Sequence, residues 1–88
     1  MDYSDQFKKH KELLDNQYDF PSEYLFKFIV PKDKVEQVKA LIPNHQYELR
    51  PSKKGNYMSV SIRYVAESSD VVLAIYEKAA LIEGLISL

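Results

Sequence analysis

The chain has 88 residues, enough for one folded domain and too few for two separate cores. Its 12 Lys and Arg residues nearly balance its 13 Asp and Glu residues, whereas nucleic-acid-binding proteins usually carry a basic excess. The chain has no cysteine, which excludes disulfides, thiolate metal sites and thiol catalysis. The charged stretch 1–16 is unlike a signal peptide and no apolar run has membrane-spanning length, so we expect a cytoplasmic protein.

The first predicted element is a short helix from Ser4 to Leu14, with Ser4 as its N-cap and with Phe7, His10 and Leu14 on one face. Because this apolar stripe is thin, we expect a loosely docked arm rather than a part of the core. The chain therefore divides into an N-terminal helical arm, residues 1–19, and a single domain, residues 20–88.

The domain opens with a strand predicted from Tyr24 to Val30, apolar on both faces as is typical of a central strand. Pro31 ends this strand. Asp33 and Glu36 have the spacing of a capping box and predict the start of a helix, whose apolar positions keep helical spacing until Pro43.

A second, short strand is predicted over residues 46–50, and Pro51 at its end suits the edge of a sheet. Residues 52–56 form a turn. The third strand, residues 57–66, has a strict period of two, which predicts one buried and one solvent-facing side. The buried side comprises Met58, Val60, Ile62 and Tyr64, and the other side Tyr57, Ser59, Ser61 and Arg63.

The last long helix is predicted to be capped by Ser68 or Ser69 and stopped by Gly84 in a left-handed conformation. Residues 85–88 then form a closing strand. The order strand, helix, strand, strand, helix, strand predicts an α+β fold: a ferredoxin-like βαββαβ two-layer sandwich. Its four-stranded antiparallel sheet carries both helices on one face, and right-handed crossovers place the first and third strands in the centre.

Two surfaces are candidate binding sites. At the hairpin, Arg50, Lys53 and Lys54 surround turn amides that could hold a phosphate, a carboxylate or an acidic partner. The alternative is a loop whose lysines only keep the chain soluble, and residue types alone favour this alternative. The second surface is the sheet face opposite the helices, which mixes Leu25, Ile29 and Tyr57 with cations and hydroxyls; either a partner or the N-terminal arm could cover it.

Motifs for catalysis, for a metal or for a cofactor are not found. His10 and His45 lie in unlike settings, without carboxylates at metal-ligand spacing, so we expect both to be solvated. The segment starting at Lys54-Gly55 matches only the first two positions of an RNA-binding RNP1 pattern and lacks its aromatic residues. We therefore predict neither a nucleic-acid partner nor a cofactor.

The segment Arg50 to Ser61 closely resembles the hairpin of the YbeD-like family of small bacterial proteins, whose pattern is approximately Pro-Ser-x-Lys-Gly-Asn/Lys-Tyr-x-Ser-Val-x-Val/Ile. Weaker matches occur at Phe20-Pro21, Phe26-Lys27 and Ile75-Tyr76-Glu77, so that the resemblance runs from about Phe20 to Leu88.

This resemblance implies a ferredoxin-like fold similar to the ACT regulatory domains, which bind amino acids in metabolic enzymes, and a function that is unsettled. Family names mention lipoate regulation, which no chemistry in the sequence supports. ACT-type sites typically use a glycine in the turn after the first strand, where this chain has Val30-Pro31-Lys32-Asp33, so we do not expect that kind of site.

We therefore predict a non-enzymatic binding or regulatory module that self-associates and takes a protein or a small anionic ligand. Its predicted binding residues are Lys27, Arg50, Ser52, Lys54, Gly55, Asn56, Tyr57, Ser59 and Arg63. One alternative is a small enzyme with a site at a subunit interface, using Lys27, Arg63 and Glu48. Another is a structural domain that self-associates through a sheet edge.

Overall fold

The computed structural model describes the backbone of residues 3–88 and the side chains from residue 8 onward. The predicted cap at Ser4 and the side chain of Phe7 lie outside the described side chains. The elements in chain order are α1 (Tyr3–Gln17), β1 (Ser22–Pro31), the 3-10 turn η1 (Lys32–Lys34), α2 (Val35–Leu41), β2 (Tyr47–Pro51), β3 (Tyr57–Ala66), α3 (Ser69–Ala79) and β4 (Ile86–Ser87).

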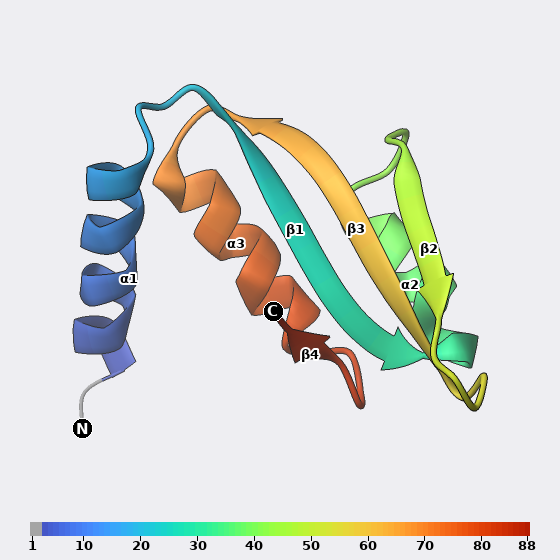
Figure 1. Cartoon of the computed structure of the whole chain (residues 1–88). Coiled ribbons are helices and arrows are strands. Elements are labelled where there is room, and N and C mark those ends of the chain that lie inside the picture. Colours follow the sequence, from blue (N-terminus) through green and yellow to red (C-terminus); the bar gives the residue numbers. More distant parts are fainter. Residues whose placement is uncertain (1–2) are drawn as a thin grey trace.

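The four strands form one antiparallel sheet in the order β2-β3-β1-β4, which confirms the predicted ferredoxin-like arrangement and its two central strands (Figure 1). β1 and β3 pair along their whole length, from Ser22 opposite Ala66 to Pro31 opposite Tyr57. In contrast, β4 pairs only with Phe28 and Ile29 of β1. The long central pair therefore fixes which side chains of the sheet share a face.

The core lies between the sheet and the helices α2 and α3. Since side chains alternate along a strand, the even-numbered residues of β1 and β3 point into this layer and the odd-numbered residues point away from it. The buried residues that form it are Phe26, Phe28, Val30, Val35, Val38, Ile42, Val60, Ile62, Ala66, Val72, Ile75, Ala79 and Ile82. The predicted period of two in β3 is confirmed, and no helix of residues 3–88 covers the odd-numbered face.

The edge position predicted for β2 is confirmed, and the register explains why Pro51 is tolerated there. The Ser52 amide donates to the Tyr57 carbonyl at 3.0 Å, so the backbone groups of Ser52 point toward β3. Backbone groups alternate in direction along a strand, so those of Pro51 point outward, away from the sheet. The missing N–H of proline therefore removes no bond from the β2–β3 ladder.

The start of α2 differs from the predicted capping box. The residues of η1 form a 3-10 turn first, Lys34 occupies the cap position, and no side chain caps either element. The Lys32 amide instead donates to the Asn56 carbonyl at 3.1 Å, which ties the turn to the β2–β3 hairpin. The capping box at Asp33 and Glu36 is wrong, because Asp33 lies inside the 3-10 turn and Lys34 occupies the cap position of α2.

The cap of α3 is confirmed at Ser68, whose hydroxyl accepts from the Val71 amide at 3.4 Å. The helix ends at Ala79, well before Gly84, so the prediction that Gly84 stops it is wrong. Gly84 does hold a positive φ of 79°, and it redirects the chain into β4. The closing strand is also shorter than predicted, with only two residues.

The N-terminal helix α1 lies against α3 and not over the open face of the sheet (Figure 1). Its contact includes Lys11, whose ammonium donates to the Ser69 hydroxyl at 2.9 Å and lies 3.2 Å from the Asp70 carboxylate. Leu14 packs against the core from the same helix. The arm thus has a defined site on α3, and the predicted alternative in which it covers the open face is wrong for the described residues.

Candidate functional site

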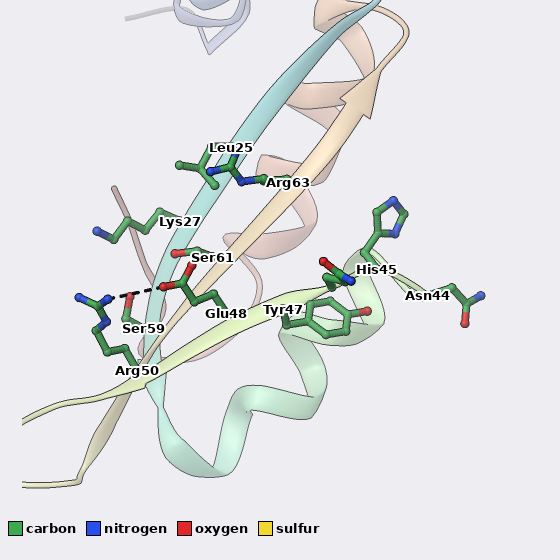
Figure 2. Close-up of a pocket in the computed structure, with 11 residues that line it drawn as sticks. Leu25, Lys27, Asn44, His45, Tyr47, Glu48, Arg50, Ser59, Ser61 and Arg63 are labelled. Atoms are coloured by element: carbon green, nitrogen blue, oxygen red, sulfur yellow. Dashed lines mark ion pairs between the residues drawn. The ribbon is translucent and has the colours of Figure 1, made fainter.

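The open face of the sheet contains a hollow of about 710 Å³. Figure 2 shows its side chains, which come from the three neighbouring strands β1, β3 and β2 and from the segment that enters β2. The lining residues are Leu25, Lys27, Asn44, His45, Gln46, Tyr47, Glu48, Arg50, Ser59, Ser61 and Arg63. The hollow therefore has a floor of strands and lies on the side opposite α2 and α3.

The strand register orders the floor into rows that cross the sheet. In the central row, Lys27 of β1 lies opposite Ser61 of β3, which in turn lies opposite Glu48 of β2. Adjacent rows on the same face are about 6.6 Å apart, because they are two residues apart along each strand. One neighbouring row therefore places Ser59 beside Arg50, and the row on the other side contains Arg63.

Two of the three cations of the hollow form ion pairs. The guanidinium of Arg63 lies 3.1 Å from the Glu23 carboxylate, and that of Arg50 lies 3.5 Å from the Glu48 carboxylate. Both pairs are well exposed, so each contributes little to stability. Lys27 has no ion-pair partner among residues 8–88, and its side chain projects outward from β1, at the position opposite Ser61 (Figure 2). The hollow thus offers one lysine without an ion-pair partner on the same face as two serines.

The rim beside β2 is held by hydrogen bonds of its own. Nδ1–H of His45 donates to the Pro43 carbonyl at 2.8 Å, since a carbonyl can only accept. The His45 ring also packs against Tyr64, with ring centroids 5.2 Å apart. The Tyr47 hydroxyl donates to the Ile42 carbonyl at 2.6 Å. These bonds give both aromatic side chains a structural role, and His45 is exposed as predicted.

The structure brings together four of the predicted binding residues and separates the others. Lys27, Arg50, Ser59 and Arg63 all line the hollow. The carboxylate of the enzyme alternative, Glu48, lines it as well, and it lies in the ion pair described above.

The remaining predicted residues lie in or beside the hairpin turn and outside the lining of the hollow. The Ser52 hydroxyl accepts from the Tyr57 amide at 3.2 Å, and the Ser52 carbonyl accepts from the Gly55 amide at 3.0 Å. The Asn56 carbonyl accepts the bond from Lys32 given above. These contacts shape the turn. Lys54 is exposed, and Tyr57 is 46% exposed at the end of β3.

Sequence reasoning missed the segment Asn44 to Gln46, which closes one end of the hollow. Asn44 has a positive φ of 63°, a conformation that asparagine adopts more readily than most residues. The asparagine directly after Pro43 is therefore the sequence signal that could have marked a sharp turn there. It also missed Ile86, which lies opposite Ile29 and so shares the open face. The sequence of residues 85–88 has no clear alternation that could have indicated this.

Among the described side chains, two ionisable groups outside the hollow have raised pKa values. A hydrogen bond to Asp70 is the main cause that raises the pKa of Lys11. Burial, followed by the hydrogen bond to Tyr24, raises the pKa of Tyr76. Both residues lie on the helical side, where Lys11 joins α1 to α3 and Tyr76 packs against the core. Within the part of the chain that the structure describes, three or more potential metal ligands do not gather anywhere.

These features define a class of protein: a ferredoxin-like α+β domain with an uncovered, cation-lined sheet face. The family model described as "Protein of unknown function (DUF493)" matches residues 15–86, and the chain belongs to this family, as its resemblance to YbeD-like proteins predicted. No curated protein and no solved structure matches the chain. Among the described helices, none combines the length and the apolar character that a membrane span requires.

Proposed function

We propose that this protein is a non-catalytic binding module whose partner occupies the open face of the sheet, over the hollow. The observation that carries the proposal is the position of Lys27. Lys27 lies on a central strand of an uncovered face, opposite Ser61 and one row from Ser59, and its ammonium has no ion-pair partner among the described side chains. An acidic group of a partner would complete this arrangement with charge-assisted hydrogen bonds.

The chemistry of the hollow supports binding rather than catalysis. Its carboxylate, Glu48, lies in a solvent-exposed ion pair with Arg50, and its histidine, His45, is hydrogen-bonded to the backbone. A general base or acid needs a group held free and close to a reacting atom. A partner held by Lys27, with Arg50 and Arg63 beside it, would instead be recognised by charge and shape, as a regulatory domain recognises its effector.

The proposal is tested by affinity capture with two variants that each remove two positive charges. Lys27→Ala/Arg50→Ala changes the hollow, and Lys53→Ala/Lys54→Ala changes the hairpin turn. Each bait is incubated with lysate of the cells that make the protein, and captured proteins are quantified by mass spectrometry. We expect the hollow variant to lose proteins that the native chain and the turn variant both retain.

Thermal unfolding of both variants controls for the fold. If the hollow variant is folded and captures the same proteins as the native chain, the open face is not the binding site. If only the turn variant loses them, the site lies at the hairpin, and Lys54 rather than Lys27 is its main cation.

A further inference from the structure

The open face carries an apolar strip beside the hollow. We define it as Leu25 and Ile29 of β1 together with Ile86 and Leu88 at the β4 edge. Ile86 lies opposite Ile29 in the register, so both side chains point to the open face. Leu88 continues this pairing, since its amide donates to the Lys27 carbonyl at 2.9 Å. Much of the strip is open to solvent, since the exposed fractions of Leu25, Ile86 and Leu88 are 52%, 54% and 62%.

Lys27 lies within the apolar strip and also lines the hollow, as Leu25 does. On β1 it is flanked along the same face by Leu25 and Ile29, and across the sheet by Ser61. Covering the strip therefore also covers the Lys27 ammonium. Because a buried charge without a partner is strongly unfavourable, the molecule that covers this face must bring an acidic group to Lys27.

A second copy of the chain fits this requirement poorly. Each open face carries three cations, Lys27, Arg50 and Arg63, and two anions, Glu23 and Glu48. Two such faces packed together would enclose an excess of positive charge and leave both Lys27 ammonium groups without an acid. Like charges brought together in this way disfavour the complex.

A small molecule also fits poorly. Ligand sites in proteins enclose most of the surface of their ligand. The hollow is lined by three strands and the segment that precedes β2, and the described helices contribute nothing to its walls. A larger partner that lies on both the apolar strip and the hollow would bury more surface than a ligand resting on the floor alone.

We propose that the occupant is an amphipathic helix of another protein, with its apolar stripe on the apolar strip and acidic side chains along the flank that faces Lys27. This inference rests on the function proposed above and specifies its partner. A helix with side chains is about 10 Å wide, and neighbouring strands are about 4.8 Å apart, so one helix covers β1 and its neighbours on either side. It would form a third layer on the sheet, opposite α2 and α3.

The test uses two synthetic helical peptides of 18 residues with the same leucine stripe, one with glutamate along its flanks and one with lysine. Each carries a fluorophore, and binding to the full chain is measured by fluorescence anisotropy at two salt concentrations. We expect the acidic peptide to bind the native chain, and Lys27→Glu to weaken it about tenfold or more, the size typical of a lost central charge pair. The basic peptide should prefer the Lys27→Glu chain.

Lys78→Glu makes the same charge change at an exposed position of α3. It serves as the matched control and should leave both affinities unchanged. Equal binding of the two peptides, or binding of the acidic peptide that is insensitive to Lys27→Glu, overturns the helix proposal. If the acidic peptide does not bind while affinity capture still depends on Lys27 and Arg50, the partner is not an acidic helix but the open face remains the binding site. If the acidic peptide does not bind and affinity capture does not depend on Lys27 and Arg50, both proposals are wrong.

Discussion

At the scale of single residues, the two glycines hold similar backbone conformations in different surroundings. Gly55 has a φ of 75° and Gly84 a φ of 79°, both in the left-handed region that other residues enter at a cost. A β-carbon added at Gly55 would meet nothing within 4 Å. One added at Gly84 would lie 2.9 Å from Cγ and 3.2 Å from Cδ of Pro31, atoms of a rigid ring.

We therefore predict that Gly84→Ala destabilises the protein more than Gly55→Ala. Gly55→Ala should lower the free energy of unfolding by about 1–2 kcal/mol, the strain of a left-handed alanine. The Gly84 variant should lose this amount and about 1 kcal/mol or more in addition, because the methyl group overpacks against Pro31. Denaturant unfolding monitored by circular dichroism measures both. Equal losses would mean that the segment around Gly84 moves to make room.

Tyr76 on α3 links its hydroxyl to that of Tyr24 on β1 at 2.8 Å. It also packs edge-on to the buried rings Phe26 and Phe28. Burial, with the bond to Tyr24, raises its pKa above the ordinary value of 10.0, so the folded state favours the neutral hydroxyl. A raised pKa in the folded state stabilises the fold below the unfolded-state pKa, and this contribution is lost as the pH rises above it.

We predict that Tyr76→Phe lowers the free energy of unfolding by about 1 kcal/mol at pH 7, since it removes one partly buried hydrogen bond. Above about pH 10 the native chain loses the contribution of Tyr76 and the variant has none to lose, so the difference should shrink. Urea unfolding of both proteins at pH 7 and pH 11 measures it. A difference in the free energy of unfolding that stays constant over this range would contradict the raised pKa of Tyr76 in the folded state.

At the scale of elements, α1 joins the domain through a few specific contacts. Lys11 reaches both Ser69 and Asp70 at the start of α3, and it also lies 3.6 Å from Asp15 within its own helix. The hydrogen bond to Asp70, the largest cause, raises the pKa of Lys11. Leu14 adds an apolar contact to the core. The arm thus depends more on one polar contact than the other helices do.

We predict that Lys11→Met speeds backbone amide exchange in residues 8–17 and leaves exchange in the paired parts of β1 and β3 unchanged. The substitution keeps a long side chain while it removes the charge that reaches Ser69 and Asp70. Lys9→Met, on an exposed position of the same helix, is the control and should change little. Hydrogen exchange followed by mass spectrometry gives both results. Unchanged protection of α1 in the Lys11 variant would show that apolar contacts alone hold the arm.

Local sequence signals predicted the elements well where the backbone conformation depends on residues that are close in sequence. The alternation of residues 57–66 and the serine before α3 have local causes, and both predictions are confirmed. The capping box at Asp33 is wrong because Asp33 lies inside a 3-10 turn, and this turn is joined to the distant hairpin by the bond from Lys32 to Asn56. The end of α3 was placed too late, because a glycine marks a left-handed residue without fixing which turn it serves.

At the scale of the whole molecule, the sequence placed the central strands and the composition of the open face, since both follow from apolar patterning. It could not place the arm, because the polar contacts of Lys11 carry no periodic signal. It also could not bound the hollow, since Asn44 to Gln46 reach the open face only through the way the chain enters β2. The turn residues Ser52 and Asn56 stay predicted binding residues; the bonds that the structure gives them join Ser52 to Tyr57 and Gly55, and the Asn56 carbonyl to Lys32.

The outward direction of the Pro51 backbone has a consequence for molecules at high concentration. A strand from a neighbouring chain could form a ladder along β2 only through the outward-facing groups of Tyr47 and Leu49, because Pro51 offers a carbonyl and no amide. Stacked cross-β assemblies need segments of about six or seven residues that pair without interruption. The same proline that ends the strand therefore protects this edge of the folded protein against growth into fibrils.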